Sequence, residues 1–453
     1  MTASLPAEVW HGLLRPDVEL APGFWNELSA TMRAAKLTFG DRVHCPFLRP
    51  IFLDPRDVSR VAQVAETLAD VGERVVQASL QDASILDAVG LTDAERPLFA
   101  LEPGYARAST ASRLDGFLLP DSLWFAEYNA ESPAGFGYTE RLAAVFDALP
   151  IMARFRERFS ADYFRLTDRM LDALIASYRE WGGTASPPTI LIVDFRGVPT
   201  WTEFEILQAR FEQLGVPTVV ADPHEMSYEG KRLTVAGRSI DLVYRRALFN
   251  DVLAHPDACA PLVQAYRART VCMANTFRCK VPHKKAFFAV LTDERFRHLF
   301  TASERELMAA HIPWTRLVTE RTTELDGRTI DLLAHVLSHR DEFVVKPNDE
   351  YGGAGVVLGW EVDAAAWQAA LDRAVAERDA WVVQRRIPVR REVFPMVDAS
   401  QGVSMRDMLV DLAPYLFRGK VAGFLTRLSS TGLANVTSGG GQVPAFVVTP
   451  RES

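Results

Sequence analysis

The hydrophobic pattern alternates between helical and strand-like segments along the chain. Residues 56–98 and 139–181 repeat apolar side chains at a spacing of about 3.6, which is typical of amphipathic helices. "PPTILIVDFRG" is a short run of β-branched residues and predicts a buried strand that ends at Asp194. "TEFEILQARFEQLGVPTVVADPHEM" then predicts a helix, a glycine stop and another strand. This βαβ unit predicts a parallel sheet flanked by helices.

Other segments predict antiparallel strands and further helices. "FLLPDSLWFAEYNAESPAG" indicates two short strands around a turn at Pro120-Asp121, and "RLTVAGRSIDLVYRR" indicates a hairpin followed by a buried strand. Helices are expected around 284–292 and through 303–340. From residue 343 onward the pattern predicts a strand, a glycine loop and another strand, then a helix over 364–379 and strands near 381–387, 391–398, 407–413 and 419–427. The fold class predicted is mixed α/β.

The length of the chain, 453 residues, favours more than one subdomain. The stretch "TASPP" at 184–188 and the region near residue 313 are candidate linkers. We therefore expect three parts: 1–184, with helices and the first hairpin, 185–312, with the βαβ unit, and 313–453, with the glycine loops.

Charge and cysteine content exclude several classes of protein. The chain has 50 basic and 58 acidic residues and a net charge of −8, which argues against a nucleic-acid binder. The N-terminus shows no leader pattern and no stretch of about 18 apolar residues occurs, so we expect a cytoplasmic protein without a membrane span. Cys45, Cys259, Cys272 and Cys279 match no zinc spacing, and we expect reduced thiols.

The stretch "FVVKPNDEYGGAGVVLGW", residues 343–360, places a lysine at the end of an apolar strand and before a glycine loop. Lys346 suits a phosphate as a point charge. Gly352, Gly353 and Gly355 let backbone N–H groups approach phosphate oxygens without a Cβ in the way. The spacing is not that of a P-loop. The alternative is a solvent-side lysine before an ordinary glycine turn.

The first hairpin carries a second polar set: Arg113 and Asp115 on one strand, and Glu127 and Asn129 on the other. Residues two apart on a strand face the same side. Three oxygen ligands suit Mg²⁺, and the arginine suits a transferring phosphoryl group. The alternative is an ion pair between Arg113 and Glu127 on a solvated face. Flanking apolar residues favour a buried hairpin, in which acids need partners.

The C-terminal stretch "GFLTRLSSTGLANVTSGGGQVPAFVV" contains a third set. Arg427 ends a strand, and Asn435 precedes a second glycine loop at residues 439–441. The alternative is a disordered loop close to the C-terminus, against which the apolar strand 446–448 argues.

Together these motifs resemble the ATP-grasp fold. R-x-D, followed twelve residues after its Asp by E-x-N, resembles the circularly permuted branch, which includes glutathionylspermidine synthase and the eukaryotic type of glutathione synthetase. The resemblance covers roughly residues 105–448. It implies that 313–453 bind the nucleotide, that 185–312 form a subdomain on the substrate side, and that the hairpin of 1–184 binds metal.

The resemblance also implies roles for single residues. It assigns Asp115, Glu127, Asn129 and Glu350 to Mg²⁺; Arg113 and Arg427 to the transferring phosphate and the acyl phosphate; Lys346, Gly352, Gly353, Gly355, Gln384 and one of Lys284 and Lys285 to ATP; and Ser132 and Asn435 to the substrate. Lys280 is a weaker candidate for the ATP lysine because the helix is expected to start at Lys284.

The activity implied is ATP-dependent ligation of a small-molecule carboxylate to an amine through an acyl phosphate, with ATP and Mg²⁺ as cofactors. The substrates implied are an amino acid, a small peptide or a polyamine. The sequence contains no cysteine-peptidase-like amidase region, and its tail differs from that of glutathionylspermidine synthases. The resemblance therefore implies the nucleotide chemistry of that family but does not identify the substrates. The alternatives are a small-molecule kinase, a carboxylate–thiol ligase and a nucleotide-binding protein without turnover.

Overall fold

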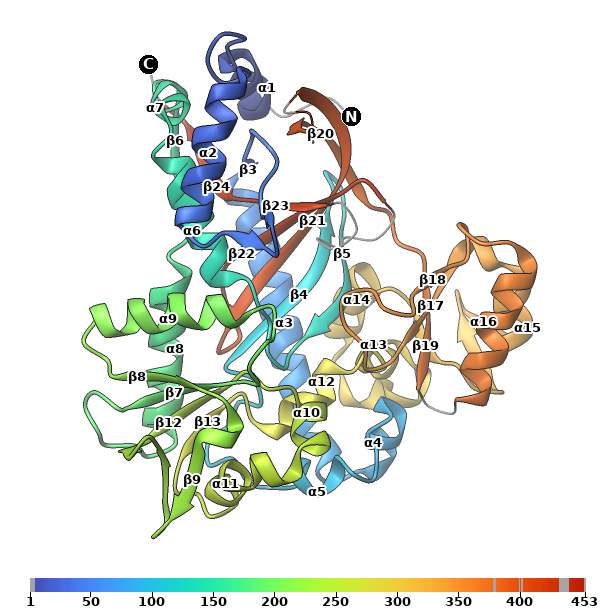
Figure 1. The fold of residues 1–453 in the computed structure, drawn as a ribbon. Helices are drawn as coiled ribbons and strands as arrows, with labels where there is room; N and C mark the ends of the chain where they lie inside the picture. Colours follow the sequence, from blue (N-terminus) through green and yellow to red (C-terminus); the bar gives the residue numbers. More distant parts are fainter. Residues whose placement is uncertain (1–4, 378–379, 399, 401, 432–439, 452–453) are drawn as a thin grey trace.

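The computed structural model describes residues 5–377, 380–398, 400, 402–431 and 440–451 (Figure 1). The described elements form a mixed α/β architecture with three principal sheets. All four cysteines are buried free thiols. No described helix has the length and apolar character needed to cross a bilayer.

The central sheet joins a hairpin at residues 111–129 to strands from the C-terminal part of the chain. In the described part of the chain its strands run in the order β23-β22-β21-β4-β5, with β20 also paired to β21. Their bounds are β4 Ala111–Leu118, β5 Leu123–Asn129, β20 Arg390–Val397, β21 Val403–Phe417, β22 Lys420–Ser429 and β23 Gly441–Val443. All pairings are antiparallel, and Tyr415 on β21 lies opposite Arg113 on β4. The hairpin β4–β5 confirms the turn predicted at Pro120-Asp121.

Helix α3 (Pro55–Ser79) packs along this sheet and contacts β21 and β22. Asp54 caps its N-terminus by accepting a hydrogen bond from the N–H of Arg56, and Pro55 takes the first helical position, where no N–H is needed. Its buried stripe includes Val61, Leu68 and Val75, so the helical periodicity expected for residues 56–98 is confirmed as far as Ser79. Beyond it the chain forms two short helices, α4 (Ala83–Val89) and α5 (Arg96–Phe99), rather than a continuous one.

The βαβ unit is also present. β7 (Ile190–Val193) and β8 (Thr218–Ala221) are parallel neighbours joined through α9 (Trp201–Gln213). β12 (Leu242–Arg245) and β13 (Cys272–Ala274) complete a parallel sheet of order β13-β12-β7-β8. Helices α8 (Leu166–Glu180) and α11 (Pro256–Arg267) pack near it, as Figure 1 shows at lower left. A parallel sheet of this kind needs both faces covered, which explains its apolar strands.

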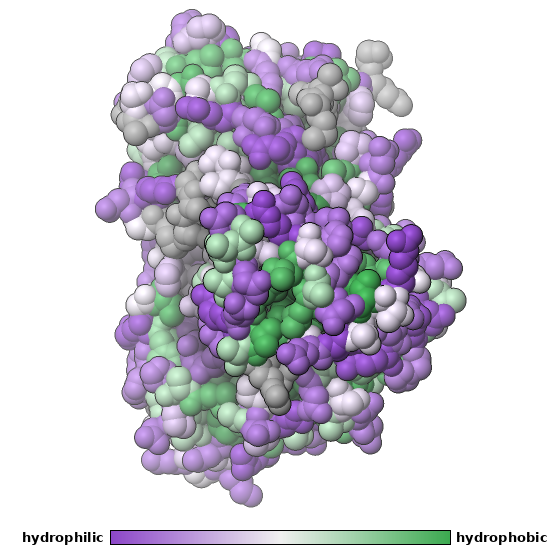
Figure 2. All heavy atoms as spheres, turned by 90° about the vertical axis from the view of Figure 1, so that its right-hand side faces the viewer, coloured by the Kyte–Doolittle hydropathy of each residue, from purple (hydrophilic) through white to green (hydrophobic). Residues whose placement is uncertain are grey.

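The third sheet has the order β14-β19-β17-β18. Its strands are β14 Thr315–Leu317, β17 Phe343–Pro347, β18 Val357–Leu358 and β19 Trp381–Arg385, and helices α15 (Leu332–Ser338) and α16 (Ala364–Ala376) pack beside it. Figure 2 looks onto this unit: its surface is largely hydrophilic, with hydrophobic side chains gathered near the middle.

The expectation of helices throughout 303–340 is wrong in part. Between α14 (Ala302–His311) and α15 the chain forms β14 and a hairpin of β15 (Thr322–Leu325) and β16 (Arg328–Asp331). Asp326 and Gly327, both with positive φ, make its two-residue turn. An Asp-Gly pair is a strong local hairpin signal because both residues tolerate that backbone conformation.

The sheets do not follow the boundaries of the three expected parts, 1–184, 185–312 and 313–453. β20 to β23 lie in the central sheet with β4 and β5, whereas β14 and β17 to β19 form a separate sheet. The expected part 313–453 therefore contributes strands to four sheets: the third sheet, the central sheet, the two-stranded sheet β15-β16 and, through β24 (Ala445–Pro450), the sheet of order β3-β24-β6, in which β3 is Ile51–Leu53 and β6 is Phe159–Asp162.

The remaining elements are α1 Leu5–Leu13, α2 Pro22–Ala34, β1 Thr38–Phe39, β2 Arg42–Val43, β3 Ile51–Leu53, α4 Ala83–Val89, α5 Arg96–Phe99, α6 Phe136–Asp147, α7 Pro150–Phe155, β6 Phe159–Asp162, η1 Pro223–Glu225, β9 Met226–Glu229, β10 Arg232–Val235, β11 Arg238–Ser239, α10 Phe249–Ala254, η2 Phe277–Cys279, α12 Lys280–His283, α13 Phe287–Thr292, η3 Glu294–Leu299, η4 Arg340–Glu342 and β24 Ala445–Pro450.

Candidate active site

A cavity of about 800 Å³ lies between the central sheet and the third sheet. Its lining includes Asp115, Glu127, Lys285, Lys346, Glu350, Gly352, Gly353, Gln384, Asp411 and Arg427. Residues 385–389, from the last residue of β19 onward, form another part of the wall. The cavity therefore brings together side chains from the first hairpin, the glycine loop and the C-terminal strands.

The hairpin residues converge through strand register. Asp115 on β4 lies opposite Glu127 on β5, and Arg113 lies opposite Asn129. The Nδ2 atom of Asn129 donates to Glu127 Oε1 at 3.0 Å. Directly opposed residues hold their Cβ atoms about 4.5–5.5 Å apart, so these side chains form one cluster.

Asp115 is buried and is bonded to two guanidinium groups. Arg113 Nε donates to its Oδ1 at 2.7 Å, and Arg427 Nη2 donates to its Oδ2 at 2.6 Å. Burial by itself would raise the pKa of Asp115, but the two arginines outweigh it and hold that pKa well below its usual range. Arg113 thus pairs with the acid on its own strand rather than with Glu127.

The donor set of the hairpin fits Mg²⁺. Asp115 and Glu127 supply carboxylate oxygens and Asn129 an amide oxygen, which are the hard ligands that this ion prefers, usually with several waters. Within the described ranges no cluster of three or more His, Cys, Asp or Glu side chains is arranged for a metal. The hairpin site has two carboxylates, and its third donor is an amide, so it does not meet that criterion even though its donors suit Mg²⁺. A cation here would have to displace positive groups, since Lys285 Nζ lies 3.5 Å from Glu127 Oε2.

Lys346 is a buried cation on the cavity wall. Its Nζ donates to the carbonyl oxygen of Ala126 at 3.0 Å and to Gln384 Oε1 at 2.8 Å. No carboxylate of the described residues lies within ion-pair distance of it, and burial lowers the pKa of Lys346 to about 8. The alternative of a solvent-side lysine is therefore wrong.

Gln384 lines the cavity, but its side chain is turned toward the lysine. Its Oε1 accepts from Lys346, and its Nε2 donates to Thr315 Oγ1 at 3.0 Å. The structure thus gives this amide two protein partners, and residues 385–389 continue the wall beyond it.

The glycines of the loop occupy two kinds of position. Gly352 and Gly353 line the cavity with φ of 67° and 78°, a left-handed conformation that favours glycine. Gly355 does not line the cavity: a Cβ there would lie 2.7 Å from Pro347 Cγ, so this glycine permits close packing of the loop on β17. Glu350 lines the cavity, and its carbonyl accepts a hydrogen bond from Lys285 Nζ.

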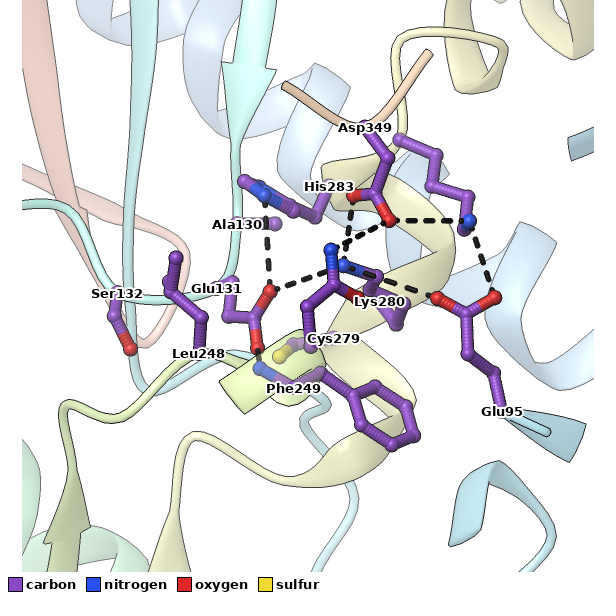
Figure 3. A network of polar contacts seen from close by, with 12 residues as sticks. Glu95, Ala130, Glu131, Ser132, Leu248, Phe249, Cys279, Lys280, His283 and Asp349 are labelled. Atoms are coloured by element: carbon purple, nitrogen blue, oxygen red, sulfur yellow. Dashed lines mark hydrogen bonds and ion pairs between the residues drawn. The ribbon is translucent and has the colours of Figure 1, made fainter. Parts of the chain in front are cut away.

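A network of charges beside the cavity includes Glu95, Glu131, Lys280 and Asp349 (Figure 3). Lys284 Nζ lies 3.1 Å from Glu95 Oε2 and 3.3 Å from Asp349 Oδ2, away from the cavity lining. Lys280 Nζ lies 2.7 Å from Asp349 Oδ1 and 3.5 Å from Glu131 Oε2. Lys285 is the lysine of this segment that reaches the cavity.

Of the two residues assigned to the substrate, Ser132 lies outside this cluster. Ser132 does not line the cavity, and its Oγ donates to the carbonyl oxygen of Arg245 at 3.0 Å. Asn435 lies outside the described residues, as does Gly439 of the second glycine loop.

Asp411 is a cavity residue that the motifs did not include. It is 1% exposed, lies opposite Arg427 in the β21–β22 register, and accepts from Arg427 Nε at 2.6 Å. Burial raises its pKa to about 6 despite this arginine. The available signal was an isolated acid within the apolar run "MLVDLAPYLF", since a buried acid needs a partner.

Comparisons with known proteins identify relatives of this chain. A putative glutamate–cysteine ligase 2-2 from Frankia casuarinae is 24% identical, over 97% of this chain and 52% of its own length. An uncharacterised protein from Mycobacterium tuberculosis is 26% identical, over 72% of this chain and 58% of its own. The chain thus spans about half the length of the curated relatives it matches.

The fold has a counterpart among solved structures. A glutathione synthetase-like effector from Globodera pallida superposes with a TM-score of 0.63 at 12% identity, covering 95% of this chain and 99% of that one. The circularly permuted ATP-grasp type 2 family matches residues 120–436. The resemblance found in the sequence is therefore confirmed, and the chain belongs to the circularly permuted ATP-grasp family.

Proposed function

We propose that this chain is an ATP-dependent ligase that joins a carboxylate to an amine through an acyl phosphate. The observation that carries the proposal is Lys346, a buried cation on the cavity wall that is bonded to two carbonyl oxygens. Burying a charge is costly unless it is paired. An anionic ligand, such as a nucleotide phosphate, would supply the missing negative charge.

The cavity also suits the rest of a nucleotide. Its volume of about 800 Å³ lies within the range of ligand sites, roughly 300–1,000 Å³. Val344, Leu358 and Ile387 offer apolar surface for a base on the side of the third sheet. Lys285 and Lys346 would hold phosphates, and the N–H groups around Gly352 and Gly353 would approach phosphate oxygens.

The proposed chemistry has two steps. A substrate carboxylate oxygen attacks the γ-phosphorus, the bond to the β–γ bridging oxygen breaks, and ADP leaves. The nitrogen lone pair of the amine then attacks the acyl carbon, the C–O bond to phosphate breaks, and inorganic phosphate leaves as the amine proton passes to water. Arg113 and Arg427 would balance the charge of the phosphoryl group during transfer.

Asp115, Glu127 and Asn129 would hold Mg²⁺, with Glu350 as a further candidate on the loop. The ion would supply charge neutralisation at the phosphates. The chain would provide the other groups. Lys285 and Lys346 would bind the phosphates, and Arg113 and Arg427 would orient the phosphoryl group and neutralise its charge. The glycine loop would cover the phosphates.

For the substrates we propose an amino acid or short peptide as the carboxylate and an amino group as the acceptor. The support is that the chain is similar to a protein named as a putative glutamate–cysteine ligase and to a glutathione synthetase-like effector. A polyamine acceptor, as in glutathionylspermidine synthases, belongs to the same chemical class of amines and is included in the test.

The test is phosphate release by the purified chain with ATP, Mg²⁺ and pools of amino acids, short peptides and polyamines. A ligase releases phosphate in step with a new amide, which mass spectrometry detects. A kinase releases ADP but no free phosphate, and a thiol ligase yields a thioester that hydroxylamine cleaves. ATP binding without phosphate release in every pool would contradict the proposal.

A further inference from the structure

The guanidinium of Arg427 lies between two carboxylates. Its Nε donates to Asp411 Oδ2 and its Nη2 to Asp115 Oδ2, both at 2.6 Å. The other oxygen of Asp411 accepts from the backbone N–H of Gly116 at 3.1 Å. Asp411 therefore binds both Arg427 and the backbone of β4, which fixes its carboxylate in the sheet.

Asp115 carries more guanidinium contacts than Asp411. Arg113 donates to Oδ1 at 2.7 Å and to Oδ2 at 3.2 Å, in addition to the bond from Arg427. A divalent cation at Asp115 would compete directly with these N–H groups. Arg427 has a second carboxylate acceptor, Asp411, whereas the further acceptor of Arg113 is the carbonyl oxygen of Ala134 at 3.1 Å. The bond from Arg427 to Asp115 is therefore the one that can be given up while the arginine stays paired with a carboxylate.

We propose that Asp411 is a positioning residue that retains Arg427 when a divalent cation replaces this arginine at Asp115. The inference rests on the proposed function, because it takes Asp115 to be a ligand of the cation. What is new is that Asp411 strengthens cation binding at Asp115, and that it does so indirectly, by holding Arg427.

The charges explain the direction of the effect. The two arginines and two aspartates of this cluster balance, and all four side chains are largely buried. Without the negative charge of Asp411, Arg427 would have Asp115 as its remaining carboxylate partner in the cluster. A cation would then have to break a buried ion pair and leave a guanidinium without a carboxylate, which is unfavourable.

The test uses Mn²⁺ alone, added to the nucleotide-free chain and followed by the EPR signal of the free ion up to millimolar concentration. Four proteins are compared: wild type, Asp411→Asn, Arg427→Met, and the double variant. Asp194→Asn serves as a control, because Asp194 is a buried aspartate that does not line the cavity. Circular dichroism checks that each protein is folded.

We expect Asp411→Asn to weaken Mn²⁺ binding by at least about tenfold, given the strength of charge interactions at a partly buried site. Arg427→Met should bind Mn²⁺ more tightly than wild type, and adding Asp411→Asn to it should change the affinity by less than about threefold. The Asp194→Asn control should bind like wild type.

Several results would overturn the inference. An Asp411→Asn variant with wild-type affinity would show that Asp411 does not matter to the cation. An equal loss with and without Arg427 would show that Asp411 acts on the cation directly. Absence of Mn²⁺ binding to the wild type would also overturn it, while the proposed function would still be decided separately by the phosphate-release assay.

Discussion

Lys280 and Asp349 form an ion pair that fixes the start of the glycine loop, with the buried Lys280 Nζ 2.7 Å from Oδ1 of a carboxylate that is partly exposed. The neighbouring residue adds to this anchor, because Asn348 accepts from the N–H groups of Lys285 and Ala286. The loop therefore consists of an anchored start, up to Asp349, and a following segment from Glu350 to Ala354 that reaches the cavity.

We expect Asp349→Asn to lower the free energy of unfolding by about 3 kcal/mol, because the buried lysines Lys280 and Lys284 each lose a carboxylate partner. Urea denaturation measures this. Glu205→Gln is the matched control: it removes an ion pair to Lys36 whose side chains are 52% and 44% exposed, and it should cost less than about 1 kcal/mol. Equal losses in the two variants would contradict the anchor.

Glu127→Gln should reduce turnover by at least about 100-fold while the fold stays intact, since it removes a charge from the proposed metal site without changing its shape. Asp121→Asn, in the exposed turn of the same hairpin, is the control and should be as active as wild type. Phosphate release at saturating Mg²⁺ is the assay. Near wild-type rates in Glu127→Gln would remove this residue from the site.

Lys284 and Lys285 should respond differently to substitution by methionine. Lys285→Met should weaken ATP binding at least about tenfold with little change in melting temperature, because Lys285 faces the cavity. Lys284→Met should lower the melting temperature, because Glu95 and Asp349 lose a buried partner. Calorimetric titration with ATP and thermal melts separate the two, and the reversed pattern would exchange their roles.

The affinity for ATP should depend on pH through Lys346. Its pKa in the unliganded fold is about 8, so at higher pH the lysine loses its proton and its attraction for phosphate. ATP binding by the wild type should weaken as pH rises from 7 to 9, and Lys346→Met should bind weakly with a flat profile. A wild-type profile as flat as that of the variant would contradict the contact.

The lowered pKa of Lys346 also determines how the stability of the unliganded fold changes with pH. Because the folded pKa lies below the unfolded value, protonated Lys346 destabilises the unliganded fold below about pH 8, and this penalty disappears toward pH 10.5. Lys346→Met should therefore be at least as stable as wild type at pH 7. A sharp loss of stability in melts without ligand would instead make Lys346 a structural residue.

The sequence predicted the parts of the site that depend on local geometry. Period-two spacing was enough to place Asp115 with Glu127, because both strands belong to one hairpin. The lysine before the glycine loop was likewise identified from a single strand and its turn.

Other parts depend on contacts that no local pattern encodes. Asp115 and Arg427 are 312 residues apart, and Asp411 enters the site only because β21 pairs with β4. The choice between Lys284 and Lys285 depends on the extended backbone of Lys284 between two short helices, which sends the two side chains to different partners.

The proposed acyl phosphate can be tested directly with ¹⁸O. The substrate pools are labelled with ¹⁸O in their carboxylates and incubated with the chain, ATP and Mg²⁺, and the released phosphate is analysed by mass spectrometry. Attack of a carboxylate on the γ-phosphorus predicts phosphate that carries one ¹⁸O atom, formed in step with the amide. Phosphate without ¹⁸O would show that water, and not the carboxylate, accepts the phosphoryl group, and would contradict the account.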